Sequence, residues 1–228
     1  MKRPGRGAAT SPRELLGRVP YFSGLSEAEL AQVQERLVST AYQGGEVIFF
    51  EGEACPGLFI VVKGQVRIFK SSSEGREQVL LLAGPGDSFN EVPIFDGGPN
   101  PATAEALEPS QLWLLPREDF LALVRDYPAM ALGVLRVFSS RVRQLTCLVE
   151  DLSFRRVLSR VAKLLLQMAE AGGPPSGRRL TQQEIASLVG TSREVVGRSL
   201  KALERDGLIR FEGHRILVLD LKALQDAI

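Results

Sequence analysis

Two predicted helix starts near the C-terminal end constrain the fold of this chain more than any other feature. The segments 181–184 (TQQE) and 191–194 (TSRE) each have the hydroxyl-x-x-Glu pattern of a capping box, which satisfies the free amides of a first helical turn. Gly190, between them, is a typical residue to end a helix. The spacing therefore predicts two short helices joined by a glycine turn, which is a helix-turn-helix.

The sequence on either side of this pair completes a small domain. Apolar runs at 208–211 and 216–219 flank the turn-forming segment 212–215, so we expect a β-hairpin that acts as a wing. Upstream, apolar residues at helical spacing predict a further helix over 154–170, which ends before the glycine–proline run 172–175. We therefore predict a winged helix-turn-helix domain over residues 154–228.

The second helix of the pair, which we expect to start at Ser192, places charged residues on its outer face. An α-helix fits the major groove of DNA, where arginine can donate to guanine O6 and N7, and glutamate can accept from cytosine N4. We expect Arg193, Glu194 and Arg198 to read bases in this way. The alternative is a solvated helix on which Glu194 and Arg198 form only a weak ion pair four residues apart.

Other residues of the same domain suit the DNA backbone. Free amides at helix starts, together with hydroxyl and cationic side chains, bind phosphate oxygens. Gly197, in the helix interior, costs about 1 kcal/mol against alanine and would let the helix backbone approach DNA closely. The expected phosphate contacts are Thr181, Gln183, Ser192, Lys201 and His214.

The middle of the chain is rich in short β-type runs separated by glycine-bearing turns. Such spacing predicts an antiparallel sandwich, barrel or jelly roll, whose interior can hold a small ligand or be filled by side chains. We assign residues 21–116 to this β-roll domain. The expected strands are 47–50, 58–62, 66–69, 78–82 and 111–115.

Residues 117–153 predict a long helix with a narrow apolar seam. Six apolar residues recur at alternating steps of three and four, which is the 3.5-residue repeat of a coiled coil. We expect a second copy of the chain to cover this seam, because an exposed apolar stripe favours association. The alternative is a helix packed only on its own β-roll. The seam residues are Leu135, Phe138, Val142, Leu145, Val149 and Leu152.

Composition excludes several classes of protein. There is no apolar run of about 18 residues that could span a membrane. Two distant cysteines, Cys55 and Cys147, form no disulfide framework, and the single histidine excludes a multi-histidine metal site or a cupin-type enzyme. The formal charge is +4 over residues 1–20, −8 over 21–153 and +5 over 154–228. This asymmetry fits a C-terminal module that meets a polyanion, or ordinary surface variation. We expect residues 1–20 to be a disordered basic arm.

The segment 180–209, LTQQEIASLVGTSREVVGRSLKALERDGLI, resembles the recognition motif of the Crp/Fnr family of bacterial transcription regulators, and the resemblance extends over roughly residues 20–220. It implies an α+β chain: an N-terminal β jelly roll of the cyclic-nucleotide-binding kind, a long dimerisation helix and a C-terminal winged helix-turn-helix. It also implies a homodimer that reads a pseudo-palindromic, TGTGA-like DNA site, contacts RNA polymerase as an activator and lies in the cytoplasm.

The expected ligand region departs from that family's pattern. Cyclic-AMP receptors have a Gly-Glu-Leu stretch followed by Arg-Ser-Ala, in which the arginine pairs with the cyclic phosphate. Here Glu91 is kept, but Pro101 and Ala102 replace the arginine and the serine, so no fixed cation balances a buried phosphate. We therefore expect no cyclic-AMP binding in the usual mode, and a Glu91 carboxylate held by loop amides. The candidate effector positions are Glu91, Ala102, Thr103 and Thr146.

Other sensing chemistries of the family have little support. Residues 1–40 lack the cysteines of the iron–sulfur branch, and His214 lies on the wing rather than where the haem branch uses a histidine. The segment 95–104 is loosely similar to the nitric-oxide-responsive branch. We expect Cys147 to be a buried, inert thiol near the seam, with a cysteine redox switch as an open alternative. We predict no catalytic residue, metal site, cofactor or membrane partner, and the effector, if there is one, is unknown.

Overall fold

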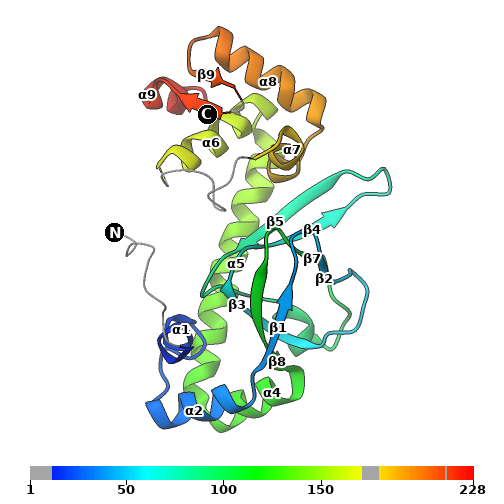
Figure 1. Ribbon diagram of the computed structural model, residues 1–228, viewed down its shortest axis with the longest axis vertical. Helices are drawn as coiled ribbons and strands as arrows, with labels where there is room; N and C mark the ends of the chain where they lie inside the picture. Colours follow the sequence, from blue (N-terminus) through cyan, green and yellow to red (C-terminus); the bar gives the residue numbers. More distant parts are fainter. Residues whose placement is uncertain (1–11, 171–179, 214) are drawn as a thin grey trace.

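The computed structural model describes residues 12–170, 180–213 and 215–228. Its dominant feature is helix α5 (Pro128–Phe154), which runs from a β-sandwich domain to a C-terminal helical domain (Figure 1). At 27 residues this helix is about 40 Å long. The two domains therefore lie along one rigid element.

The β-sandwich consists of two antiparallel sheets of four strands each. The first has the order β1-β8-β3-β6 and the second has the order β2-β7-β4-β5. In chain order the strands are β1 (Val38–Tyr42), β2 (Val47–Phe49), β3 (Gly57–Lys63), β4 (Val66–Ser71), β5 (Glu77–Ala83), β6 (Ser88–Phe89), β7 (Thr103–Ala106) and β8 (Ser110–Pro116). The five strands expected from the sequence are confirmed, with small shifts at their ends.

Aromatic side chains fill the interior of the sandwich. The rings of Phe59 and Phe89 stack with centroids 5.2 Å apart, and Phe49 packs against both. All three side chains are buried, together with Val61 and Leu112. The expected β-roll is thus a sandwich with a close-packed apolar centre.

The N-terminal part corrects one expectation. Residues 12–20 are not a disordered arm, because α1 (Pro12–Arg18) forms a helix there. Leu16 and Val19 are fully buried in the core under α5, and this apolar area stabilises the segment. The remainder of the expected arm, residues 1–11, lies outside the described residues.

Helix α2 (Glu27–Glu35) begins with a capping box. The Ser26 side chain accepts from the Glu29 amide, and the Glu29 carboxylate accepts from the Ser26 amide. These reciprocal hydrogen bonds fix the residue at which the helix begins. Helix α3 (Val92–Asp96), a single turn after β6, was not expected.

The long helix expected over 117–153 is divided in two. Helix α4 (Arg117–Asp126) ends before α5, and Tyr127 between them has a non-helical ψ of 88°. A residue that precedes a proline is disfavoured in the helical region, so Pro128 sets this break. Within α5, Gly133 lies against the backbone of Pro20 and Tyr21, where a Cβ atom would come within 2.6 Å of the Pro20 carbonyl oxygen.

In its described residues, the C-terminal domain packs four helices and a two-stranded wing around one core. Helix α6 (Val157–Glu170) contributes Val161 and Leu165, which pack on the buried residues of the helix-turn-helix. The other elements are α7 (Gln182–Val189), α8 (Arg193–Arg205), β9 (Ile209–Glu212), β10 (Arg215–Val218) and α9 (Leu221–Asp226). The winged helix-turn-helix is confirmed, and only α9 was not expected. Within the described ranges, no helix is long and apolar enough to cross a membrane.

Candidate nucleic-acid interface

Helix α7 begins at the capping box expected from the sequence. The Glu184 amide donates to Thr181 Oγ1 at 3.2 Å, and the Thr181 amide donates to Glu184 Oε2 at 2.6 Å. The Thr181 hydroxyl itself donates to the same carboxylate at 2.9 Å. The hydroxyl proton of Thr181 is therefore engaged in a hydrogen bond within the capping box. Thr181 and Gln183 are both exposed at the start of the helix.

The cap of helix α8 differs by one residue from the expectation. Ser192, not Thr191, is the N-cap, and its Oγ accepts from the Val195 amide at 3.5 Å. The helix therefore begins at Arg193. Gly190 ends the preceding helix with a left-handed φ of 71°, as the glycine turn requires.

Helix α8 has one buried face and one charged face. Val196, Leu200 and Leu203 are almost fully buried against the domain core. Residues 194, 197, 198 and 201 lie on the same side of the helix as Arg193, because a helix has 3.6 residues per turn. This side is opposite the buried face. The exposed charged residues of this side are Arg193, Glu194, Arg198 and Lys201.

The local chemistry keeps Glu194 negatively charged. A hydrogen bond from the Ser192 side chain, and then one from the backbone, hold the pKa of the Glu194 carboxyl below its usual value. Arg193 and Arg198 lower this pKa further. Glu194 is thus an acceptor flanked by two cations, which is the arrangement needed to contact a base-edge amine next to guanine.

Gly197 lies on the same face and has room for a methyl group. A Cβ atom built there would lie 3.4 Å from Gln182 Oε1, at the end of a flexible side chain. The fold therefore does not by itself require glycine at this position.

The wing is an antiparallel hairpin that is hydrogen-bonded to α8. In the register of the two strands, Arg215 lies opposite Glu212 and Ile216 lies opposite Phe211. The Phe211 amide donates to Glu204 Oε1 at 3.1 Å, which joins β9 to α8. His214, one of the expected phosphate contacts, lies outside the described residues.

The apolar seam of α5 is mostly exposed in the single chain. Phe138 is the exception, because it packs edge-on against Phe95 with ring centroids 5.8 Å apart. Leu135, Val142 and Val149 are each at least 60% exposed. Leu145 and Leu152 are also exposed. Packing on the chain's own β-roll thus accounts for only one of the six seam residues.

The structure commits the Glu91 carboxylate to buried hydroxyl groups. Tyr21 Oη donates to Glu91 Oε1 at 2.7 Å, and Ser88 Oγ lies 3.0 Å from the same oxygen. The expectation that loop amides hold this carboxylate is therefore wrong. Burial first, and then the Glu91 charge, raise the pKa of Tyr21 far above its usual value. Arg141 of α5 joins this cluster by donating to the Ser88 carbonyl at 2.8 Å.

The other candidate effector positions have separate surroundings. Ala102 is buried, while Thr103 Oγ1 accepts from the Glu51 amide at 3.1 Å. Thr146 is exposed on α5, and its hydroxyl donates to the Val142 carbonyl of its own helix at 2.9 Å.

Two asparagines join the segments that lie before and after α3. Asn90 adopts a left-handed φ of 75° and donates to Asn100 Oδ1 at 3.1 Å. Asn100 is almost fully buried. Sequence analysis missed Tyr21, Arg141, Asn90 and Asn100, and no local pattern marks residues that meet from such distant parts of the chain.

The two cysteines differ in environment. Cys55 is partly buried, and burial raises the pKa of its thiol. Cys147 is exposed, so the expectation of a buried thiol is wrong. In the described part of the chain, no group of three or more His, Cys, Asp or Glu side chains could hold a metal ion.

Comparisons with known proteins match both domains. Residues 39–127 match the model of the cyclic nucleotide-binding domain, and residues 159–227 match the Crp-like helix-turn-helix domain. A CRP-like cAMP-activated global transcriptional regulator of Mycobacterium tuberculosis is 35% identical, with 92% of this chain and 97% of that protein covered. The cyclic AMP receptor protein of Thermus thermophilus is 34% identical over 91% of this chain and 95% of its own.

A solved structure shares the whole architecture. A regulator of the crp/fnr family from Eubacterium rectale has a TM-score of 0.77 at 25% identity, with 92% of this chain and 98% of that chain covered. The exposed, charged face of α8 thus lies in a domain whose sequence and fold are both those of known regulators. The chain belongs to the Crp/Fnr family of DNA-binding transcription regulators, which are not enzymes.

Proposed function

We propose that this protein is a homodimeric regulator that reads a pseudo-palindromic, TGTGA-like operator through α8. The exposed face of α8 carries this proposal. Arg193, Glu194 and Arg198 contact base edges there, and Lys201 binds phosphate. Thr181, Gln183 and Ser192 lie at the two helix starts, where free amides favour phosphate oxygens.

The exposed seam of α5 supports dimerisation. A second copy would bury the apolar side chains that the single chain leaves in water, and twofold pairing is the commonest way to do so. Such a dimer presents two copies of α8 to half-sites one helical turn apart, about 34 Å.

We further propose that the regulator does not depend on cyclic AMP in the manner of its cAMP-activated relatives. Pro101 and Ala102 provide no cation for a cyclic phosphate. In addition, the Glu91 carboxylate already accepts from Tyr21 and lies within hydrogen-bond distance of Ser88. Phe59 and Phe89 stack inside the sandwich, which supports a filled core rather than a nucleotide pocket. Membership of this family supports a protein that lies in the cytoplasm and activates transcription by contacting RNA polymerase.

A gel-shift titration of the purified, ligand-free protein tests the proposal. The duplex carries two TGTGA half-sites as a pseudo-palindrome, and the control duplex has one half-site scrambled. We expect tight binding to the first duplex only, with no change on adding cyclic AMP. Equal binding to both duplexes would overturn the operator assignment, and a requirement for cyclic AMP would overturn the proposed independence.

A second candidate is a regulator gated by another effector or by redox chemistry. The exposure of Cys147 favours keeping this candidate. It predicts that specific binding appears only after an additive, such as a native copurifying molecule identified by mass spectrometry, or after thiol oxidation. Constitutive binding, with activity set by the amount of protein, predicts no such requirement.

A further inference from the structure

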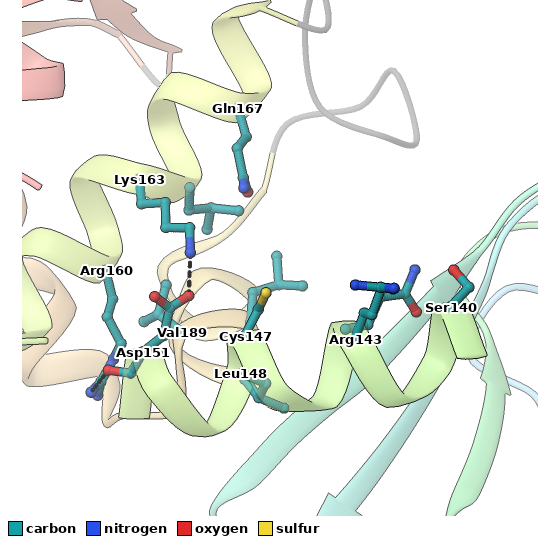
Figure 2. A pocket seen from close by; sticks show the side chains of 12 residues that line it. Ser140, Arg143, Cys147, Leu148, Asp151, Arg160, Lys163, Gln167 and Val189 are labelled. Atoms are coloured by element: carbon teal, nitrogen blue, oxygen red, sulfur yellow. Dashed lines mark hydrogen bonds and ion pairs between the residues drawn. The ribbon is translucent and has the colours of Figure 1, made fainter. Parts of the chain in front are cut away.

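A cavity of about 400 Å³ lies between α5, α6 and α7, outside the β-sandwich (Figure 2). We call it the interdomain cavity. Pockets of this size accommodate small organic ligands. Its lining residues on α5 are Ser140, Arg143, Gln144, Cys147, Leu148 and Asp151. On α6 and α7 they are Arg160, Lys163, Leu164, Gln167, Leu188 and Val189.

The lining carries more positive than negative charge. Arg143, Arg160 and Lys163 contribute three cations, against the single carboxylate of Asp151. That carboxylate is already shared, because its Oδ2 pairs with Lys163 Nζ at 2.5 Å and its Oδ1 pairs with Arg155 Nε at 2.9 Å. The pairing with Asp151 therefore leaves the other lining cations without a balancing anion.

Two guanidinium groups of the lining have no carboxylate partner among the residues that the structure describes. Arg160 donates to the carbonyl oxygens of Asp151, Arg155 and Gly190, and its buried Nε has no hydrogen-bond partner in the structure. Arg143 forms no hydrogen bond or ion pair with any described residue. In Figure 2 the Cys147 sulfur lies between the Lys163–Asp151 pair and Arg143. An anion in this space would therefore meet a cation that is free to bind it.

The rest of the lining is mixed. Leu148, Leu164 and Val189 supply apolar surface, whereas Ser140 and Gln167 supply groups that can donate hydrogen bonds. Pockets that combine an apolar wall with a few placed polar groups select organic ligands by shape and orientation. We propose that the interdomain cavity binds a small organic anion that carries phosphate or carboxylate groups.

The position of the cavity gives such a ligand a regulatory role. Arg160 lines the cavity and also joins the C-terminal end of α5 to the end of α7, through Arg155 and Gly190 at 3.2 Å each. A ligand that contacts both α5 and α6 would favour one angle between the long helix and the DNA-reading helices. Binding itself is independent of the proposed function, whereas this consequence rests on it.

Calorimetric titration of the full-length protein without DNA tests the site. The probes are inorganic pyrophosphate and tricarballylate, at low ionic strength because salt screens an open, charged site. Arg143→Gln removes the unpaired cation without breaking a contact of the fold. Arg136→Gln is the matched control, because Arg136 is exposed on the same helix but does not line the cavity.

We expect at least one probe to bind, and Arg143→Gln to weaken it about tenfold, while Arg136→Gln leaves it unchanged. Binding of pyrophosphate alone would identify a phosphate-bearing ligand, and binding of tricarballylate alone a polycarboxylate. Failure of both probes to bind, or equal losses in the two arginine variants, would overturn the proposal. A loss of operator affinity in Arg143→Gln without any binding of a probe would overturn it in favour of a DNA contact.

A gel shift with the bound probe separates this inference from the proposed function. Probe binding that changes operator affinity in the wild type, but not in Arg143→Gln, supports the regulatory consequence. Probe binding without specific DNA binding would leave the site standing and overturn the proposed function.

Discussion

Tyr21 and Glu91 share a buried hydrogen bond of 2.7 Å, although 70 residues separate them in the chain. The contact joins the segment after α1 to the start of α3, and Arg141 connects the same cluster to α5 through Ser88. The Glu91 carboxylate thus holds the N-terminal segment in place.

Replacing Tyr21 by phenylalanine tests the strength of this bond. Tyr21→Phe leaves the Glu91 carboxylate buried with one donor fewer, so we expect a loss of about 1–3 kcal/mol in the free energy of unfolding. The matched control is Tyr127→Phe, because Tyr127 donates to Gln32 at the surface, where water can replace it. Urea titrations compare the two, and equal losses would contradict the assigned role of the buried bond.

The raised pKa of Tyr21 predicts a dependence of stability on alkaline pH. In the unfolded chain this hydroxyl ionises near its ordinary value of about 10, whereas in the folded chain burial and Glu91 keep it neutral. The contribution of Tyr21 to the free energy of unfolding is therefore complete below pH 10 and declines as the pH rises above 10. The difference in unfolding free energy between wild type and Tyr21→Phe should shrink above pH 10, and a constant difference would contradict the linkage.

Two substitutions on α8 separate base reading from phosphate binding. Arg193→Ala should cost about 1–3 kcal/mol on the specific operator and relax specificity. Lys201→Ala should weaken specific and random duplexes alike and lower the salt dependence by about one counterion. Gel shifts at several salt concentrations measure both effects. Equal losses on both kinds of duplex for both variants would show that Arg193 does not read a base.

Gly197→Ala tests whether the backbone of α8 lies close to DNA. The nearest atom is 3.4 Å away, so the folded domain should accept the methyl group and gain up to about 1 kcal/mol from helix propensity. We nevertheless expect weaker operator binding, because the methyl group would lie between helix and DNA. Thermal unfolding and gel shifts provide the two readouts. An unchanged affinity would mean that glycine is not needed for close approach.

Charge placed in the seam of α5 should separate the dimer. Leu145→Glu alters a side chain that is 47% exposed in the single chain, so the subunit should keep its circular dichroism spectrum. Its mass by sedimentation should nevertheless fall to that of a monomer. Arg136→Glu, away from the seam on the same helix, is the control. A dimer that persists in Leu145→Glu would show that another surface holds the copies together.

Sequence patterns predicted the elements whose signal is local. The capping box at Thr181, the glycine turn at Gly190 and the amphipathic face of α8 depend on neighbouring residues, and the structure has each of them. The unexpected strands lack such a signal: β1 is mostly exposed, β6 has two residues and β7 reads Thr-Ala-Glu-Ala. Their conformation depends on the neighbouring strands with which they pair.

Contacts between distant segments account for the remaining errors. Residues 1–20 look polar and flexible in composition, yet Leu16 and Val19 are buried once α5 lies beside them. The partners of Glu91 come from Tyr21 and from β6, and no spacing rule relates these positions. The charged face of α8 was predictable, whereas the interdomain cavity appears only when α5, α6 and α7 are placed together.

The turn at Gly190 is constrained from outside its own domain. Its φ of 71° would accept asparagine, but a Cβ atom would lie 2.1 Å from Gln78 Oε1 of β5 and 2.9 Å from Leu152 Cδ2 of α5. Both atoms are the ends of flexible side chains, so any side chain at position 190 would displace Gln78 and Leu152. The residues that this turn of the C-terminal domain can accept thus depend partly on a side chain of β5, which belongs to the β-sandwich.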